Sequence, residues 1–538
     1  MSYKNSLKQI FLPILFAVIL VLGIYIGKLS SVVEDKPESH GAMPQNFGTF
    51  SKLDEVLNTL SIMYVDTINK DKIVEKTIPE ILKQLDPHTV YIPKSELEDV
   101  NSELSGKFSG IGVQFNIQSD TVVVIAVISN GPSQKVGILP GDRIIKVNDS
   151  LFVGKKITNN VVLDNLRGTK GTKVKLAIQR RDVNDLLSFD IIRDDIPVNT
   201  VDIAYMIEPT IGYIRVDRFG QKTYDEFMVG LAKLKNAGME KLIIDLRGNS
   251  GGYLDVAINM CNEFLPKNSL IVYTKGRTLE RQNVFADGSG SMQGIKVVAL
   301  IDEFSASASE IVSGALQDND RGTIVGQRSF GKGLVQQQVP LADGSALRVT
   351  IARYYTPSGR CIQKTYEDGV EAYYKDINNR YKHGEFFSKD STHYKDTVQY
   401  KTVKGRTVYG GGGIMPDVFI PTDTTQLTET YYELWNHGNL YKFTFNLVDA
   451  NREKFKSFKT ADELVEHLKS TNLFEKYIVQ AEKSGAKINK QELAISKSKI
   501  ELELYAMVCR NIFNEYGYFP LLNKNDEAIK QSIEALNK

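Results

Sequence analysis

Serines and a lysine in two short motifs are the residues of this chain whose chemistry stands out. Residues 305–310 read Ser-Ala-Ser-Ala-Ser-Glu, and residues 330–336 read Phe-Gly-Lys-Gly-Leu-Val-Gln. A serine hydroxyl becomes a nucleophile when a nearby base accepts its proton, and a lysine can be that base if burial lowers the pKa of its amine. Ser307 and Lys332 therefore predict a hydrolase that works without histidine.

Ser307 follows a predicted strand and opens a predicted helix at 307–318. Its hydroxyl and the amide of Ala308 are then expected at the positive end of the helix dipole, where a developing oxyanion is stabilised. Residues 307–310 also fit a capping box, in which the serine only ends the helix. Taken alone, those four residues favour the capping interpretation.

A second motif with catalytic potential is Asp-Leu-Arg-Gly-Asn-Ser-Gly-Gly at residues 245–252, after another predicted buried strand. Glycines allow the backbone to approach a substrate closely. The amides of Gly251 and Gly252 are therefore candidates to complete an oxyanion hole. A plain glycine turn is the structural alternative.

Residues 326–333 match the spacing of a phosphate-binding loop except at the last position. Gly333 stands where a serine or threonine would bind magnesium, and the following residues predict a strand where such a loop needs a helix. The three cysteines are far apart and the six histidines are scattered, so neither a metal site nor a cofactor is predicted. A net charge of +1 gives no indication of nucleic-acid binding.

The N-terminus differs in composition from the rest of the 538-residue chain. Residues 10–26 are almost wholly apolar and lie between two lysines, which predicts an uncleaved signal anchor in preference to a cleaved signal peptide. Lysines on the short leading side place that end in the cytoplasm. We therefore expect a single-pass protein of the cell inner membrane, tethered by this segment, with its catalytic body on the extracytoplasmic (periplasmic) side.

Apolar spacing indicates the elements that position the motifs. It predicts helices over 50–85, followed by a rigid turn in which His88 is expected to be a structural polar residue. From residue 210 onward, strand and helix patterns alternate, as is typical of an α/β core. Residues 364–407 are polar and poorly periodic. Helical spacing returns after residue 425.

Glycine-rich alternating runs between residues 107 and 195 resemble a PDZ domain, most specifically in the segment 137–148 with its Pro-Gly-Asp turn. The glycine-rich loop that opens it consists of Gly110, Ile111, Gly112 and Val113. Such a loop can hold a terminal carboxylate on its backbone amides, and the adjacent strand edge can pair with an extended peptide. The alternative is a small β-domain that binds nothing.

Together, the motifs resemble the C-terminal processing peptidases, a family of tail-specific serine proteases with a PDZ domain. The resemblance covers roughly residues 50–421 and includes the motif Tyr-Tyr-Thr-Pro-Ser-Gly-Arg at 354–360. It implies that Ser307 is the nucleophile, that Lys332 is its base, and that Gln336 orients the lysine. It also implies protein or peptide substrates that are recognised by their C-terminal tails.

The resemblance implies a multidomain α/β fold that has a crotonase/Clp-protease-like catalytic core with an inserted PDZ domain. Helical spacing adds an N-terminal helical segment and a C-terminal helical extension. The expected divisions are a membrane anchor or signal (1–30), a linker (31–49), an N-terminal helical region (50–105), the PDZ domain (106–196), the serine protease core (197–425) and the extension (426–538). The extension could form a homo-oligomer, dock an adaptor or pack on the core.

Two other functions fit part of the sequence. A catalytically inactive, membrane-tethered PDZ scaffold would bind C-terminal tails without cleaving them, but intact Ser307, Lys332 and Gln336 argue against it. A crotonase-fold acyl-transfer enzyme that uses coenzyme A is disfavoured by the PDZ insert and by the expected export.

Overall fold

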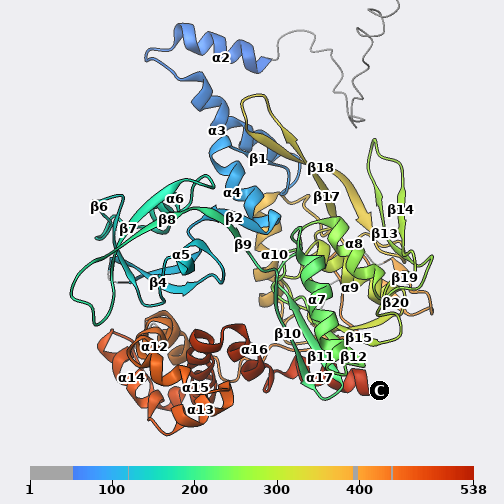
Figure 1. The fold of residues 1–538 in the computed structure, drawn as a ribbon. Helices are drawn as coiled ribbons and strands as arrows, with labels where there is room; N and C mark the ends of the chain where they lie inside the picture. The colour runs from blue at the N-terminus through green and yellow to red at the C-terminus, as the bar shows by residue number, and fades with distance from the viewer. Residues whose placement is uncertain (1–51, 119, 392–397, 438–439) are drawn as a thin grey trace, which may run out of the picture. The chain divides into compact units, whose positions relative to one another are not determined.

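The computed structural model describes residues 52–118, 120–391, 398–437 and 440–538 (Figure 1). The chain divides into two units, Met1–Val74 and Glu75–Lys538. Helix α2 (Lys52–Met63) belongs to the first unit, and α3 (Lys70–Leu82) begins in it. The sheets of the described residues all belong to the second unit. The prediction of a multidomain α/β fold is confirmed.

A six-stranded, mostly parallel sheet forms the centre of the α/β core. Its strands, in spatial order, are β10 (Val201–Glu208), β11 (Ile211–Val216), β12 (Lys241–Asp245), β15 (Lys296–Ile301), β16 (Gly322–Gly326) and β21 (Val418–Phe419). Strands β10 and β11 are antiparallel, and the other neighbours are parallel. Parallel strands are joined by crossing helices and are buried on both faces, so they form from near-continuous apolar runs.

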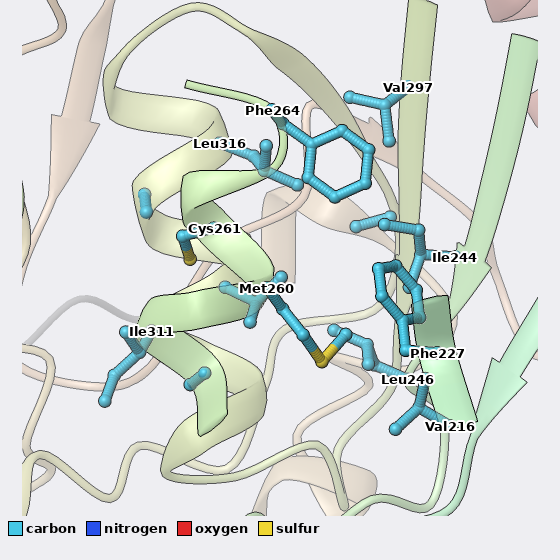
Figure 2. Packing of buried hydrophobic residues seen from close by; sticks show 14 of the residues in the cluster. Val216, Phe227, Ile244, Leu246, Met260, Cys261, Phe264, Val297, Ile311 and Leu316 are labelled. Atoms are coloured by element: carbon cyan, nitrogen blue, oxygen red, sulfur yellow. The ribbon is translucent and has the colours of Figure 1, made fainter. Parts of the chain in front are cut away.

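Alternate side chains of these strands enter two different cores because successive residues of a strand point to opposite faces. In β12, Ile244 belongs to the first core and Ile243 to the second; in β15, Ala299 and Val298 divide in the same way. Three helices cover the first face: α7 (Thr223–Asn236), α8 (Leu254–Asn262) and α9 (Ala308–Asp318). Figure 2 shows Met260 of α8 pointing toward the strand side chains of this core.

The second face of the sheet is covered from the C-terminal extension. Helix α17 (Glu527–Asn537) packs Ile529 and Leu536 against Val298 and Leu300 of β15. The preceding helices have a hydrophobic core of their own. They are α11 (Glu429–Asn436), α12 (Leu440–Lys456), α13 (Ala461–Lys469), α14 (Leu473–Lys483), α15 (Lys490–Phe513) and α16 (Glu515–Asn523).

A five-stranded sheet carries the segment after Lys332. Its long strand β18 (Ala346–Tyr355) pairs antiparallel with β17 (Leu334–Pro340), β1 (Val90–Ile92) and β13 (Leu270–Lys275), and β13 pairs with β14 (Gln282–Phe285). Both the predicted rigid turn before β1 and the lysine loop before β17 are therefore attached to β18.

An antiparallel sheet lies within the segment predicted to be a PDZ domain. Its elements are β3 (Val113–Gln118), β4 (Thr121–Val127), β5 (Arg143–Val147), β6 (Ser150–Leu151), β7 (Lys173–Gln179) and β8 (Leu187–Ile192), with helices α5 (Pro132–Lys135) and α6 (Asn159–Leu166). Helix α4 (Lys94–Ser105) precedes it. Strands β2 (Lys107–Gly110) and β9 (Asp194–Pro197) pair where the chain enters and leaves the domain.

The poorly periodic residues 364–407 contain more regular structure than their sequence indicates. They form helix α10 (Val370–Lys382), the short strands β19 (Gln399–Lys401) and β20 (Thr407–Tyr409), and a single 3-10 turn at Lys389–Ser391. Only Tyr373 and Arg380 of α10 are buried. Few residues of this helix are apolar, so its sequence gives little helical signal.

The predicted membrane anchor, residues 10–26, lies outside the described residues. Among the helices that are described, none has both the length and the apolar character needed to cross a bilayer. That finding corrects the prediction of a single-pass inner-membrane protein with a periplasmic catalytic body, since no described span supports it.

Candidate active site

Ser307 directly precedes α9 and has a backbone conformation that is rare for a residue with a side chain, with φ of 55° and ψ of −111°. Such conformations cost of order 1–3 kcal/mol and persist only where the surroundings hold them. One of the contacts that holds it is the carboxylate of Glu310, which accepts a hydrogen bond from the Ser307 amide at 2.8 Å. Capping of α9 is therefore real. It fixes the position of the serine without excluding chemistry at the hydroxyl.

The three serines of the motif differ in exposure. Ser305 and Ser309 are fully buried. Their hydroxyls donate to the backbone oxygens of Leu246 and Asn249 at 2.8 Å and 2.9 Å respectively. Ser307 is the partly exposed member of the three. Because a nucleophile must reach its substrate, exposure favours Ser307 over its two neighbours.

Lys332 lies in the loop that joins β16 to β17, and it is half-buried. Its amine donates to Gln336 Oε1 at 3.1 Å, and within the described ranges no carboxylate forms an ion pair with it. Burial, followed by the positive charge of Arg348, lowers the pKa of this amine, while Glu310 and Asp86 oppose the shift. A lowered pKa increases the fraction of the amine that is neutral at a given pH, and the neutral amine is the form that can accept a proton.

Gln336 connects Lys332 to the rigid turn before β1. Its Nε2 donates to the backbone oxygen of His88. Asp86 stabilises the turn, because its carboxylate accepts hydrogen bonds from the amides of His88 and Thr89 at 2.8 Å and 2.9 Å. The rigid turn Leu-Asp-Pro-His-Thr at residues 85–89 thus contributes a backbone carbonyl that fixes the amide of the glutamine, and the glutamine in turn holds the lysine.

The imidazole of His88 supports a structural role for this residue. Its Nε2 lies 2.8 Å from the hydroxyl of Tyr373 in α10. Burial, and after it the charge of Lys332, lowers the pKa of His88 to about 4. The ring is therefore neutral at pH 7 and adds no positive charge beside the lysine.

Two residues that the sequence does not single out join the segments of Ser307 and Lys332. The buried carboxylate of Glu310 accepts hydrogen bonds from the amides of both, at 2.8 Å and 2.9 Å. The hydroxyl of Tyr354, in β18, lies 3.0 Å from the backbone oxygen of Ser307 and 2.6 Å from that of Lys332. In the sequence Glu310 is visible only as part of a capping box and Tyr354 only as part of a family motif.

The Ser307 hydroxyl and the Lys332 amine are not directly hydrogen-bonded in the part of the chain that the structure describes. Their segments are nevertheless neighbours, since the Phe330 amide donates to the backbone oxygen of Ser305 at 3.0 Å. Hydrogen bonds between catalytic groups are often long in unliganded enzymes and shorten when substrate binds. The arrangement is compatible with proton transfer from the serine to the lysine.

The glycine-rich loop after β12 passes beside the start of α9. Gly251 has φ of 103°, and a Cβ atom there would lie 2.7 Å from Ser307 Cβ and 3.0 Å from the Ala308 nitrogen. Only glycine allows this approach. The Gly251 amide donates to Asn249 Oδ1 at 2.8 Å. Among the described residues, the amides of Ala308 and Gly252 have no protein acceptor, so these two remain available for a substrate oxygen.

Residues 110–113, the predicted carboxylate-binding loop, join β2 to β3. The backbone oxygens of Ile111 and Gly112 accept hydrogen bonds from the amides of Ser133 and Ile128, each at 3.0 Å. No acceptor for the amides of Ile111 and Gly112 occurs among the residues that the structure describes. Backbone arranged in this way can offer its N–H groups to a carboxylate.

Comparisons with known proteins match three segments of the chain. Residues 210–375 match peptidase family S41, residues 109–194 match the PDZ domain, and residues 430–514 match a family of unknown function (DUF8443). The carboxy-terminal-processing protease of Bartonella bacilliformis is 35% identical over 348 residues, which cover 64% of this chain and 79% of that protein. The chain belongs to the carboxy-terminal-processing protease family.

Further carboxy-terminal-processing proteases are similar over comparable lengths. Carboxy-terminal processing protease CtpB of Bacillus subtilis is 32% identical over 352 residues, covering 64% of this chain and 72% of that protein. Among solved structures, the photosystem II D1 C-terminal processing protease matches with a TM-score of 0.35 and 24% identity, over 69% of this chain and 92% of its own.

Membership in the carboxy-terminal-processing protease family confirms the resemblance drawn from the motifs and makes the chain a serine-type peptidase with a PDZ domain. Among the described residues, no group of three or more His, Cys, Asp or Glu side chains could hold a metal ion.

Proposed function

We propose that this protein is a serine endopeptidase in which Ser307 is the nucleophile and Lys332 the general base. Support comes above all from the state of the lysine, a half-buried amine with a lowered pKa that hydrogen-bonds Gln336 and pairs with no described carboxylate. An ordinary lysine, with a pKa of about 10.4, is almost wholly protonated at pH 7 and cannot accept a proton. Burial favours the neutral form that can.

In the proposed reaction, neutral Lys332 accepts the proton of Ser307 Oγ while that oxygen bonds to the carbonyl carbon of the scissile peptide. The carbonyl electron pair moves to oxygen and forms a tetrahedral oxyanion. The lysine ammonium then gives its proton to the leaving nitrogen as the carbon–nitrogen bond breaks, and an acyl-enzyme remains. Water attacks the ester, Lys332 accepts the water proton, and that proton returns to Ser307 Oγ as the new carboxyl product leaves.

We assign the oxyanion hole to the amides of Ala308 and Gly252. Ala308 is the first residue of α9, where the helix dipole adds positive potential. Gly251, which the sequence also indicates, has its amide engaged by Asn249. Its proposed contribution is to let the loop pass beside Ser307. Gln336 is proposed to orient the lysine, as a positioning residue.

We further propose that residues 110–113 hold the terminal carboxylate of the substrate. A tailed peptide with a free C-terminus should then be cleaved with a kcat/KM about tenfold higher or more than its C-terminally amidated form, because hydrogen bonds to a charged group contribute about 1.5–3 kcal/mol. Initial rates on the two peptides measure the difference. Equal turnover of both forms would contradict the role of the PDZ loop.

The chemistry of the tail defines the proposed substrate. The expectation that the substrates are exported proteins depends only on the predicted N-terminal membrane anchor, and that prediction is corrected above. The proposed substrate is therefore specified by its free C-terminus and not by its compartment. A homo-oligomer or an adaptor bound through residues 426–538 stays a prediction.

A catalytically inactive PDZ scaffold that binds tails is the second candidate. It is favoured by the missing hydrogen bond between the Ser307 hydroxyl and the Lys332 amine in the described part of the chain. A scaffold needs no reactive serine, whereas a serine peptidase reacts with phosphonylating reagents through the same nucleophile and oxyanion hole. The reactivity of Ser307 therefore separates the two functions.

The test treats the full chain with a biotinylated fluorophosphonate and maps the modified residue by mass spectrometry after digestion. We expect the adduct on Ser307, none on Ser305 or Ser309, and cleavage of a tailed peptide in a parallel sample. Pretreatment with the fluorophosphonate should stop that cleavage. Binding of the tailed peptide without an adduct and without cleavage would support the scaffold instead.

A further inference from the structure

The last helix of the chain is built into the catalytic core. Helix α17 buries Ala528, Ile529 and Leu536 against the face of the central sheet opposite α8 and α9. Its C-terminal turn is held by two strand lysines. Lys241 of β12 donates to the Asn537 side chain at 2.7 Å, and Lys296 of β15 donates to the Leu536 backbone oxygen at 3.3 Å. Cations near the last carbonyls of a helix favour this docking.

Asp526, at the start of α17, has two functions at once. One carboxylate oxygen caps the helix by accepting hydrogen bonds from the amides of Ala528 and Ile529, the first at 2.9 Å. The other oxygen accepts a hydrogen bond from Arg247 Nη1 at 2.7 Å. This ion pair connects the C-terminal extension to the Asp-Leu-Arg-Gly-Asn-Ser-Gly-Gly motif of the candidate active site.

Arg247 is held on its other side by Asp245, the buried residue that ends β12. Its Nη2 donates to Asp245 Oδ2 at 2.7 Å and its Nε to Oδ1 at 3.0 Å. Burial alone would raise the pKa of Asp245, but Arg247 and Arg215 outweigh it and hold that pKa below the usual value. The guanidinium thus bridges one carboxylate in the sheet and one on the C-terminal helix.

The loop that starts at Arg247 supports the nucleophile segment. Two residues further on, Asn249 binds the Gly251 amide with its side chain at 2.8 Å. The backbone oxygen of Asn249 accepts hydrogen bonds from the Ala306 amide at 3.0 Å and from the Ser309 hydroxyl at 2.9 Å. A shift of Arg247 would therefore reach the loop with Gly251 and Gly252 and, through Asn249, the residues Ala306 and Ser309 on either side of Ser307.

We propose that Asp526 is a positioning residue for the peptidase reaction, which acts through Arg247 on the glycine loop. The C-terminal extension then completes the catalytic unit instead of being an independent appendage. This role rests on the proposed functions of Ser307 and Gly252. An oxyanion donor is effective only within about 2.7–3.1 Å of the developing charge, so a small displacement of the loop lowers the rate without abolishing binding.

Asp526→Asn tests the role because asparagine is as good a helix cap as aspartate but carries no charge. We expect kcat on a tailed peptide to fall about threefold to tenfold, as for loss of a partly buried charge-assisted hydrogen bond. KM should not change, and the midpoint of thermal unfolding should stay within about 2 °C. Asp526→Ser, which also keeps a cap without a charge, should behave in the same way.

Thr460→Ala is the matched control, since Thr460 caps α13 by accepting from the Glu463 amide and has no contact with the glycine loop. It should lower the unfolding midpoint and leave kcat unchanged. The rate of fluorophosphonate labelling at Ser307 should follow kcat in all variants. If the labelling rate and kcat of Asp526→Asn equal those of the unmodified protein, the role of Asp526 is refuted. It is also refuted if the loss of kcat is fully explained by a lower midpoint of thermal unfolding. An unmodified protein that is never labelled at Ser307 would refute the proposed nucleophile as well.

Discussion

Ser307→Ala is expected to abolish cleavage of a tailed peptide, with kcat lower by about 10³-fold or more. The substitution removes the oxygen that forms the acyl-enzyme, and the remaining oxyanion donors alone give only residual catalysis. Because the PDZ loop is untouched, the affinity for the peptide tail should be retained. Initial rates measured by chromatography and tail affinity measured by fluorescence anisotropy check the two expectations.

Ser309→Ala provides the matched control two residues away. Its hydroxyl donates to the Asn249 backbone oxygen inside the core, and that oxygen keeps a second donor, the Ala306 amide. We therefore expect most of the activity to remain and the free energy of unfolding to fall by about 1 kcal/mol. Loss of activity in Ser309→Ala with retention in Ser307→Ala would assign the nucleophile to the other serine.

The sequence contains enough information to predict the α/β core and the residues that gather at the site. Strands β11 and β15 lie in the region after residue 210 where strands and helices are predicted to alternate, and they are recognisable because both faces of a parallel sheet are buried and each strand is a nearly unbroken apolar run. The resemblance to the family implies that Gln336 orients Lys332, and the structure places the Gln336 side chain within hydrogen-bonding distance of the lysine amine. A β-bulge between Val335 and Gln336 shifts the register of β17 against β18, and no pattern in the sequence reveals it.

Contacts between segments that are far apart in the sequence could not be predicted. The His88 carbonyl that holds Gln336 and the Tyr354 hydroxyl between the segments of Ser307 and Lys332 depend on tertiary packing. The sequence also does not show that α17 packs on the core. Helices α7, α8 and α9 cover one face of the central sheet, and the apolar side chains on its other face, such as Ile243, are buried by α17.

Lys332→Met should lower kcat by about 10²–10⁴-fold, the usual contribution of a general base. Lys332→Arg is the matched control, because it keeps the positive charge but has a pKa above about 12 and cannot accept the serine proton. Both variants are therefore expected to be inactive, and both should still bind the tailed peptide. Substantial turnover by Lys332→Arg would show that the positive charge, and not proton acceptance, is what the reaction uses.

The lowered pKa of Lys332 also fixes the direction of two pH effects. Because the neutral amine is the base, kcat/KM should rise with pH through the pKa of Lys332 in the free enzyme, below the ordinary value of about 10.4. His88, with a pKa of about 4, adds no step near neutral pH. Arg348→Gln removes a charge that helps to lower the lysine pKa, so it should move this rise to higher pH. If kcat/KM of Arg348→Gln rises at the same pH as that of the unmodified protein, the group that titrates in the pH profile is not Lys332.

The same shift predicts that the lysine costs stability. Between the folded-state pKa of Lys332 and its unfolded value near about 10.4, the unfolded chain binds more protons than the folded one, so stability rises with pH across that window. Lys332→Met removes this dependence. The variant should therefore unfold at a higher temperature than the unmodified protein at pH 7, and the difference should shrink as the pH approaches 10. An equal or larger gain at pH 10 would mean that the cost comes from packing and not from the buried amine.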